Sequence, residues 1–216
     1  MSERIVIATG GTLGEWALRH IEPDDTLVGA DRGALFLIRN GLKPAIALGD
    51  FDSVTEEEKE EIRASSSQFS DCDPVQKDLT DTDAAFQWAM ARHPSHIVLL
   101  GALGSRFDHS LANIHLLRIA EERGVRCTIV DPCNTIELLG PGRTAVVDRN
   151  GMYAHVSLLP LTMDVTGVTL EGFLYPLHDA SLTIGQSLGV SNVLVQQSGS
   201  ITISGGLLLL MQSKDG

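Results

Sequence analysis

Short apolar runs alternate with amphipathic segments along the first 131 residues. Runs rich in Val, Ile and Leu predict strands buried on both faces, and they lie at residues 4–8, 26–30, 45–48, 96–100 and 125–130. The segments between them that predict helices are residues 33–39, 56–64, 82–92 and 108–122. Strands alternating with helices of this length indicate βαβ units. We therefore predict an α/β domain with a Rossmann-like, mostly parallel sheet over residues 1–131.

The pattern changes after Asp131, where the apolar runs become short and β-branched and are separated by Gly, Pro, Asn or Asp. The predicted strands are residues 135–139, 144–147, 154–159, 187–190, 193–195, 201–204 and 207–210. Short strands at this spacing are typical of a sandwich or a small barrel. We predict an all-β domain, either a sandwich or a small barrel, over residues 132–216, with the boundary between Pro132 and Gly142.

Composition narrows the possible partners. Hydrophobic residues make up 43% of the 216 residues and charged residues 20%, which is ordinary for a globular chain. The 28 acidic against 16 basic residues give a net charge of −12. Such a chain repels phosphate backbones and anionic membrane surfaces, so we expect no nucleic-acid and no membrane partner. Seven aspartates lie between Asp50 and Asp83, and aspartates gathered in loops often bind metal.

Cysteine spacing and the shortness of the apolar runs together predict a protein of a reducing compartment. The three cysteines, Cys72, Cys127 and Cys133, are odd in number and show no CxxC spacing, which argues against disulfides and zinc. The apolar run near the N-terminus is too short for a signal peptide. The run at 207–211 is far shorter than the roughly 18 residues that span a bilayer. We expect a cytoplasmic protein.

Three acidic segments share one predicted setting. Asp31 follows the second strand, Asp50 and Asp52 follow the third, and the carboxylates of residues 78–83 precede a helix. Ligands of open parallel sheets bind beyond the carboxyl ends of the strands. Mg²⁺ prefers a few carboxylates and keeps waters for substrate phosphates. These loops therefore predict a divalent cation at one edge of the sheet.

Helix capping is the competing interpretation of the same carboxylates. Asp31, taken alone, is more typical of an N-cap, and for residues 78–83 capping or compensation of the helix dipole is an equal alternative. Capping explains residues 50–52 less well, because Ser53 or Thr55 begins a capping box for the next helix. The convergence of three acidic loops favours the metal.

Residues 101–109 form a second candidate element, Gly-Ala-Leu-Gly-Ser-Arg-Phe-Asp-His, between a strand and a helix. Its glycines allow close backbone approach, and the helix start offers free N–H groups to phosphate. Arg106 is suited to clamp phosphate oxygens. Asp108 is either the N-cap or a ribose ligand, and Asn113 is one helical turn on. The turn at 9–12, Thr-Gly-Gly-Thr, lacks the dinucleotide and Walker patterns, so a plain tight turn is an equal alternative.

Taken together, these motifs resemble the thiamine pyrophosphokinase family. The matching segments are Ala-Asp-Arg-Gly at 30–33, Gly-Asp-Phe-Asp-Ser at 49–53, Lys-Asp-x-Thr-Asp at 77–81 and Gly-x-x-Gly-Ser-Arg-x-Asp-His at 101–109, with Asn113. Residues 172–177 and 190–192 are similar to that family's thiamine-binding segments. The resemblance covers residues 4–211.

The resemblance implies a reaction, a fold and a set of site residues. Family members transfer a pyrophosphoryl group from ATP to thiamine with Mg²⁺, giving thiamine diphosphate and AMP. They are homodimers of α/β and β-sandwich domains, with the active site at the subunit interface. The implied metal ligands are Asp50, Asp52 and Asp81, and the implied catalytic set adds Asp78 and Arg106. The implied substrate-binding residues are Asp31, Lys77, Arg106, Asp108, Asn113, Tyr175, Ser191 and Asn192.

Three alternatives stay open at this point. One is a pyrophosphokinase for another hydroxymethyl heterocycle, such as a pterin, against which the second β domain argues. Another is a non-catalytic thiamine or nucleotide sensor, against which the intact set of aspartates argues. The third is a structural α/β protein whose aspartates only cap helices. Asp78, Asp81 and Asp83 are all candidates to accept the hydroxyl proton.

Overall fold

The computed structural model describes residues 3–71, 79–149 and 151–215. The chain divides into two compact units, Met1–Pro132 and Cys133–Gly216. Each unit has its own hydrophobic core. Within the described residues, no helix has the length and apolar character needed to cross a membrane.

The sheet of the first unit consists of parallel strands in the order β4-β3-β2-β1-β5-β6. The strands are β1 (Arg4–Ala8), β2 (Thr26–Ala30), β3 (Ile46–Gly49), β4 (Phe69–Asp71), β5 (His96–Leu100) and β6 (Arg126–Val130). From β1 the chain adds β2, β3 and β4 on one side and then returns to add β5 and β6 on the other. The order therefore reverses between β1 and β5, the position at which open α/β sheets bind ligands.

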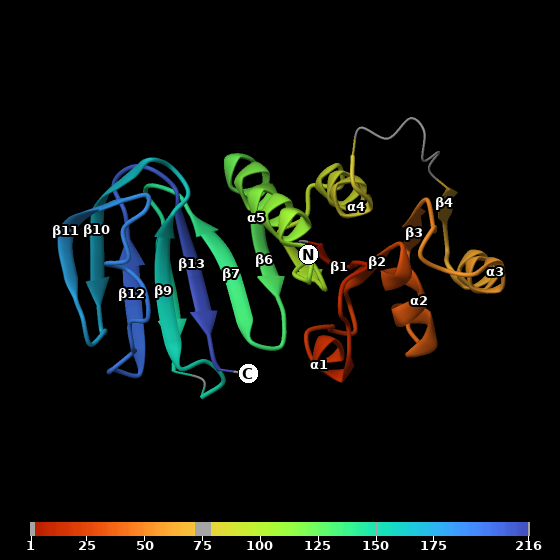
Figure 1. Ribbon diagram of the computed structural model, residues 1–216, viewed down its shortest axis with the longest axis horizontal. Helices are drawn as coiled ribbons and strands as arrows, with labels where there is room; N and C mark the ends of the chain where they lie inside the picture. Colours follow the sequence, from red (N-terminus) through yellow and green to blue (C-terminus); the bar gives the residue numbers. More distant parts are fainter. Residues whose placement is uncertain (1–2, 72–78, 150, 216) are drawn as a thin grey trace. The chain divides into compact units, whose positions relative to one another are not determined.

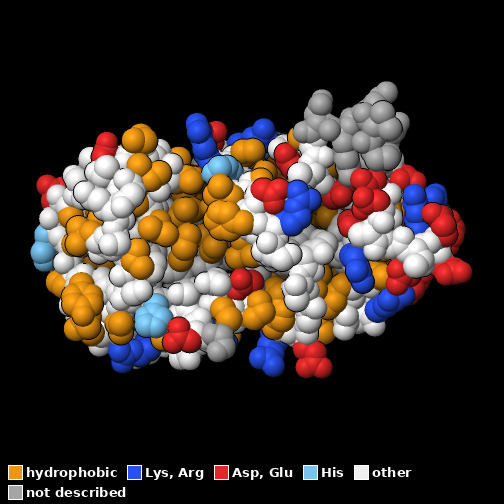
Figure 2. Space-filling model, viewed as in Figure 1, with side chains coloured by type: hydrophobic (Ala, Val, Ile, Leu, Met, Phe, Trp, Pro, Cys, Tyr) orange, Lys and Arg blue, Asp and Glu red, His pale blue; other side chains and the backbone are white. Residues whose placement is uncertain are grey.

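Helices cover both faces of this sheet, with α1 and α2 on one side and α4 and α5 on the other (Figure 1). The helices are α1 (Glu15–Leu18), α2 (Arg32–Arg39), α3 (Glu56–Ser65), α4 (Asp81–Met90) and α5 (Phe107–Glu122). A capping box begins α3: the Thr55 side chain accepts from the Glu58 N–H, and the Glu58 side chain accepts from the Thr55 N–H. Thr55, and not Ser53, is therefore the cap. Acidic side chains gather over the α3 end of this unit (Figure 2).

Nearly continuous apolar strands explain why this unit folds as a layered sheet. Residues of β1, β2, β5 and β6 are buried together with Ala17 of α1 and Leu37 of α2. A second cluster packs α2 and α3 around Phe51, whose ring stacks on Phe69 of β4 with centroids 4.8 Å apart. Burial of such apolar surface stabilises the fold by about 25 cal/mol per Å².

The second unit contains only β-structure among its described residues. Its strands are β7 (Asn134–Leu139), β8 (Thr144–Asp148), β9 (His155–Pro160), β10 (Asp164–Glu171), β11 (Leu177–Thr183), β12 (Ser198–Thr202) and β13 (Leu208–Ser213). β13 pairs antiparallel with β7 and β9. The other strands form an antiparallel sheet in the order β11-β10-β12-β8. Strands from both groups share one buried core. The fold as a whole is mixed α/β, with a mostly parallel sheet and a second, antiparallel sheet.

Several predicted elements differ from the observed ones in this β-rich part. The strand predicted at 187–190 is wrong, because a turn closes there with the Val190 N–H bonded to the Ser187 carbonyl at 3.0 Å. The strand predicted at 193–195 is reduced to an isolated bridge between Phe173 and Leu194. The pattern missed β10, whose register shifts around Gly167, and β11, most of whose residues are exposed or only partly buried. In the first unit it missed the short elements α1 and β4.

Candidate active site

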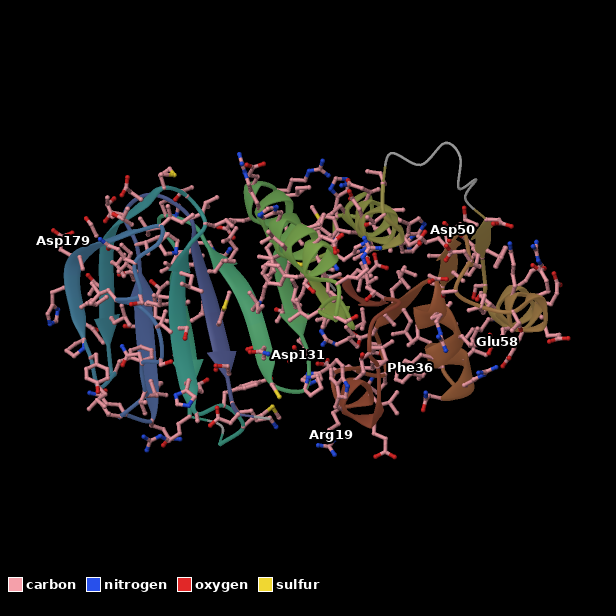
Figure 3. All side chains as sticks on the ribbon, viewed as in Figure 1. Arg19, Phe36, Asp50, Glu58, Asp131 and Asp179 are labelled. Atoms are coloured by element: carbon pink, nitrogen blue, oxygen red, sulfur yellow. The ribbon has the colours of Figure 1, made fainter. Side chains whose placement is uncertain are left out.

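A cavity of about 660 Å³ opens in the first unit, at the carboxyl ends of β1, β2, β3 and β5. Asp50, labelled in Figure 3, lies where β3 ends. One part of the wall carries carboxylates, and another is made by the loop between β5 and α5. The chemically distinctive lining residues are Thr9, Gly10, Gly11, Asp31, Asp50, Asp52, Asp81, Arg106, His109 and Asn113. Five chain segments, namely the loops after β1, β2, β3 and β5 and the start of α4, therefore meet near the point where the strand order reverses.

Asp31 occupies the N-cap position of α2, but its side chain makes no capping hydrogen bond. Its backbone has φ 51° and ψ −128°, a region that residues other than glycine seldom adopt. The Asp31 N–H donates to the Leu48 carbonyl at 3.0 Å, which ties the ends of β2 and β3 together. The capping interpretation of Asp31 is therefore wrong, and the carboxylate lines the cavity instead.

Asp50 and Asp52 flank a buried anchor. Phe51 between them is only 3% exposed and has φ 57°, so its ring points into the core while its neighbours line the cavity. The Asp52 N–H donates to Asp50 Oδ1 at 3.3 Å within the same turn. Gly49, which precedes the turn, has φ 148°, and a Cβ there would lie 3.2 Å from Asp81 Oδ1. The turn thus requires glycine next to its two carboxylates.

Asp81 is the first residue of α4 and lines the same cavity. The cap of this helix is Thr80, whose side chain accepts a hydrogen bond from the Asp83 N–H at 3.2 Å. Asp83 bonds Gln87 one turn further along the helix. Of the acidic residues predicted at 78–83, Asp81 therefore lies in the cavity and Asp83 does not line it. Lys77 and Asp78 lie outside the described residues.

The carboxylate wall has the chemistry of a divalent-cation site. Ligand oxygens of Asp31, Asp50 and Asp52 all lie within 4.8 Å of one another. Within the described part of the chain, Asp31 Oδ1 is buried and accepts no hydrogen bond. Burial raises the pKa of the Asp31 carboxyl, the charges of Asp81 and Asp52 add to the rise, and the Ser53 hydroxyl opposes it. A cation would offset this repulsion, so the residues fit Mg²⁺.

The other part of the cavity wall is a glycine loop that α5 holds in place. Asn113, which is buried, donates from Nδ2 to the Ala102 carbonyl at 2.7 Å. Ser110 Oγ accepts from the Gly104 N–H at 3.0 Å. A Cβ on Gly11 would lie 2.0 Å from the Gly101 carbonyl oxygen, so the turn after β1 packs directly on this loop. Two glycine turns in backbone contact thus form one surface.

Arg106 lies at the start of α5 and is largely exposed. Its guanidinium makes two hydrogen bonds to the Asp108 carboxylate, at 2.6 and 3.3 Å. The guanidinium lowers the pKa of the Asp108 carboxyl, so this side chain remains anionic. The N-cap position belongs to Arg106, and the N-cap interpretation of Asp108 is therefore wrong. Asp108 instead orients the Arg106 guanidinium at the N-terminus of α5, which lines the cavity.

Comparisons with known proteins agree with this geometry. A family model described as "Thiamin pyrophosphokinase, catalytic domain" matches residues 18–129, and one described as "Thiamin pyrophosphokinase, vitamin B1 binding domain" matches residues 144–208. The thiamine pyrophosphokinase of Bacillus subtilis (strain 168) is 34% identical over 189 residues, 87% of each chain. This chain belongs to the thiamine pyrophosphokinase family.

Solved structures of the family extend the similarity to the whole chain. A crystal structure of thiamine pyrophosphokinase from Bacillus subtilis has a TM-score of 0.91 and 31% identity, covering 99% of this chain and 100% of that one. A crystal structure of thiamin pyrophosphokinase from Geobacillus thermodenitrificans has a TM-score of 0.88 and 34% identity, covering 99% and 98%. The mixed α/β fold is thus that of thiamine pyrophosphokinases.

The site residues predicted in the second unit cluster around one buried amide. Asn192 donates from Nδ2 to the Tyr175 carbonyl at 2.7 Å, and its Oδ1 accepts from the Tyr175 and Val193 N–H groups. The Ser191 N–H donates to Ser157 Oγ, and Ser191 has φ 60°. The side chain of Tyr175 is exposed. The Asn192 side chain therefore holds the Tyr175 backbone, and Tyr175 and Ser191 are the exposed residues of this group.

Sequence reasoning undervalued three features of the first unit. It gave no preference to the Thr9–Thr12 turn, although Gly10 and Gly11 line the cavity. The signal was a double glycine directly after the first strand. It did not single out Ser110, whose contact with Gly104 depends on tertiary packing. It treated Ser53 as a possible cap, whereas Ser53 Oγ donates to Asp31 Oδ2 at 2.6 Å.

Proposed function

We propose that this protein transfers the pyrophosphoryl group of ATP to the hydroxyl of thiamine, giving thiamine diphosphate and AMP. The observation that carries the proposal is the single cavity in which carboxylates and a glycine loop with Arg106 face a common space. One wall suits a metal and the other suits phosphates. Membership of the thiamine pyrophosphokinase family supports this reading of the cavity.

The finer architecture belongs to the same proposal. We describe the first unit as a Rossmann-like domain that binds ATP and metal, over residues 1–131, and the second as a β-sandwich domain for thiamine, over 132–216. The proposal includes a homodimer with the active site at the subunit interface. This agrees with the apolar side chains that the second unit exposes, since in a monomer they would be in contact with solvent. These side chains are Leu174, Tyr175, Leu188 and Val190.

The proposed roles follow from charge and position. Asp50, Asp52 and Asp81 would hold Mg²⁺, Asp81 from its place in the lining of the same cavity. Asp31, whose oxygen lies within 4.8 Å of those of Asp50 and Asp52, would support that site. Bound Mg²⁺ would neutralise charge on the polyphosphate. Arg106 would bind phosphate oxygens through its planar guanidinium, kept in orientation by Asp108.

The transfer itself requires little covalent chemistry from the protein. The thiamine hydroxyl oxygen forms a bond to the β-phosphorus in line, while the bond between that phosphorus and the α,β-bridging oxygen breaks and AMP leaves. The hydroxyl proton passes to a carboxylate, for which Asp78 and Asp81 are the candidates, and the family's motif assigns Lys77 to substrate binding. Ser191, Asn192 and Tyr175 belong to the proposed thiamine pocket. The net charge of −12 favours the approach of cationic thiamine.

The direct test is an assay for AMP formation from ATP, with and without thiamine and with and without Mg²⁺. We expect AMP only when both are present, together with an equal amount of thiamine diphosphate. A parallel reaction with a hydroxymethyl pterin should release none. AMP formation with the pterin and not with thiamine would replace thiamine as the proposed substrate. Thiamine binding without AMP formation would identify the protein as a non-catalytic sensor.

Replacement of Arg106 tests the phosphate-binding role. We expect Arg106→Ala to lower kcat/KM for ATP by about 10²–10³-fold, since loss of a comparable electrostatic stabiliser has that cost. Arg118→Ala is the matched control, because Arg118 lies on the same helix and forms a similar exposed pair with Glu122 at 2.7 Å. Equal effects of the two substitutions on steady-state kinetics would contradict the assignment of Arg106.

A further inference from the structure

The Ser53 hydroxyl makes a contact that helix capping does not explain. Its Oγ donates to Asp31 Oδ2 at 2.6 Å, across 22 positions of the chain. The contact joins the loop after β3 to the end of β2. The side chains of Thr55 and Glu58 make the two contacts of the capping box of α3, so Ser53 is not needed there. Its hydroxyl is thus directed at the carboxylate and not at its own helix.

This hydrogen bond selects between the two oxygens of Asp31. With Oδ2 held by Ser53, Oδ1 is the oxygen that is buried and, among the described residues, accepts no hydrogen bond. The Asp31 backbone is already restrained, since its N–H bonds Leu48 and its φ is 51°. The remaining freedom is rotation of the side chain about χ1 and χ2, and a short hydrogen bond to one oxygen restrains it.

We propose that Ser53 is a positioning residue, which orients the Asp31 carboxylate toward a divalent cation shared with Asp50 and Asp52. The inference rests on the metal site of the proposed function and deepens it. Groups that hold metal ligands in orientation commonly change metal affinity by about 10–100-fold when they are removed. Because Ser53 acts through Asp31, its effect should appear in cation binding before any chemistry takes place.

The test measures binding of Mn²⁺, as a spectroscopic substitute for Mg²⁺, by electron paramagnetic resonance with the unreactive α,β-methylene analogue of ATP present. We expect Ser53→Ala to weaken Mn²⁺ binding by about tenfold or more. Ser53→Thr keeps the hydroxyl and should bind within about twofold of the parent protein. An unchanged affinity in Ser53→Ala, or an equal loss in both variants, would overturn the role of the hydroxyl.

The control removes a similar hydroxyl–carboxylate contact elsewhere in the chain. Thr183 Oγ1 donates to Asp164 Oδ1 at 2.8 Å in the second unit, 19 positions apart. Thr183→Val should leave Mn²⁺ affinity unchanged, and a loss equal to that of Ser53→Ala would show a general effect on the fold and overturn the inference.

The binding measurement and the AMP assay can fail independently. If the parent protein releases no thiamine-dependent AMP but the Ser53 variants differ in Mn²⁺ affinity as described, the proposed function fails and the role of Ser53 stands. If thiamine-dependent AMP is found and Ser53→Ala binds Mn²⁺ normally, the proposed function stands and the role of Ser53 fails. A parent protein that binds no Mn²⁺ would overturn the role of Ser53 outright.

Discussion

Asp50→Asn and Asp52→Asn, made separately, should each reduce thiamine-dependent AMP formation at saturating Mg²⁺ to below about one hundredth of the parent rate. Both side chains line the cavity, and their oxygens lie within 4.8 Å of each other and of Asp31. An amide keeps the shape of the side chain but loses the charge that a hard cation requires. The rate of AMP release with ATP, thiamine and Mg²⁺ is the measurement.

The same substitutions should leave the fold intact. Removing one of several clustered negative charges relieves repulsion, so thermal stability without metal should be equal or higher. Added Mg²⁺ should raise the melting temperature of the parent protein, by linkage between binding and folding, and should raise it less in either variant. Asp24→Asn, at an exposed position of the same unit, is the control for both measurements. Near-normal turnover in both site variants would refute the metal assignment.

Phe51→Ala should destabilise the first unit by about 3–5 kcal/mol, the usual cost of removing a fully buried aromatic side chain. Phe51 is 3% exposed, its ring stacks on Phe69 at 4.8 Å, and it belongs to the cluster that joins α2 and α3. Its burial also holds a backbone with φ 57° between two cavity carboxylates. The loss of this anchor should therefore weaken cation binding as well as stability.

Urea unfolding followed by tryptophan fluorescence measures this effect selectively. Both tryptophans of the chain, Trp16 and Trp88, lie in the first unit, so the signal reports that unit. Phe107→Ala is the matched control, since this ring is 74% exposed and its removal should change the free energy of unfolding by less than about 0.5 kcal/mol. A loss below about 1 kcal/mol for Phe51→Ala would show that the turn does not depend on its anchor.

Local pattern predicted the parallel part of the fold more closely than the β-rich part. Strands such as Arg4–Ala8 are buried on both faces, so their sequence is a continuous apolar run. β11 has few buried residues, so its apolar signal is weak, and β10 changes register near Gly167. Four-residue α1 and three-residue β4 are too short for periodicity to emerge.

The candidate site was predictable where chemistry is local. Asp31, Asp50 and Asp52 follow strands directly, so the parallel arrangement alone places them at one edge of the sheet. The sequence pattern placed Asp31 among three acidic loops of a cation site, while the family resemblance assigned it to substrate binding. The structure groups its oxygen with those of Asp50 and Asp52. The approach of Gly11 to Gly101 joins segments about ninety positions apart, and no local signal marks such a pair.

The sequence by itself determined which residues carry charge and which turns contain glycine, because both are properties of the residues and of short spacing. Only the tertiary structure decided which oxygen of Asp31 is buried, that Ser53 donates to the other oxygen, and that Asn192 holds the Tyr175 backbone. Those contacts join residues 22 and 17 positions apart, which the fold brings together. Their geometry depends on the packing of the whole unit, which no short segment encodes.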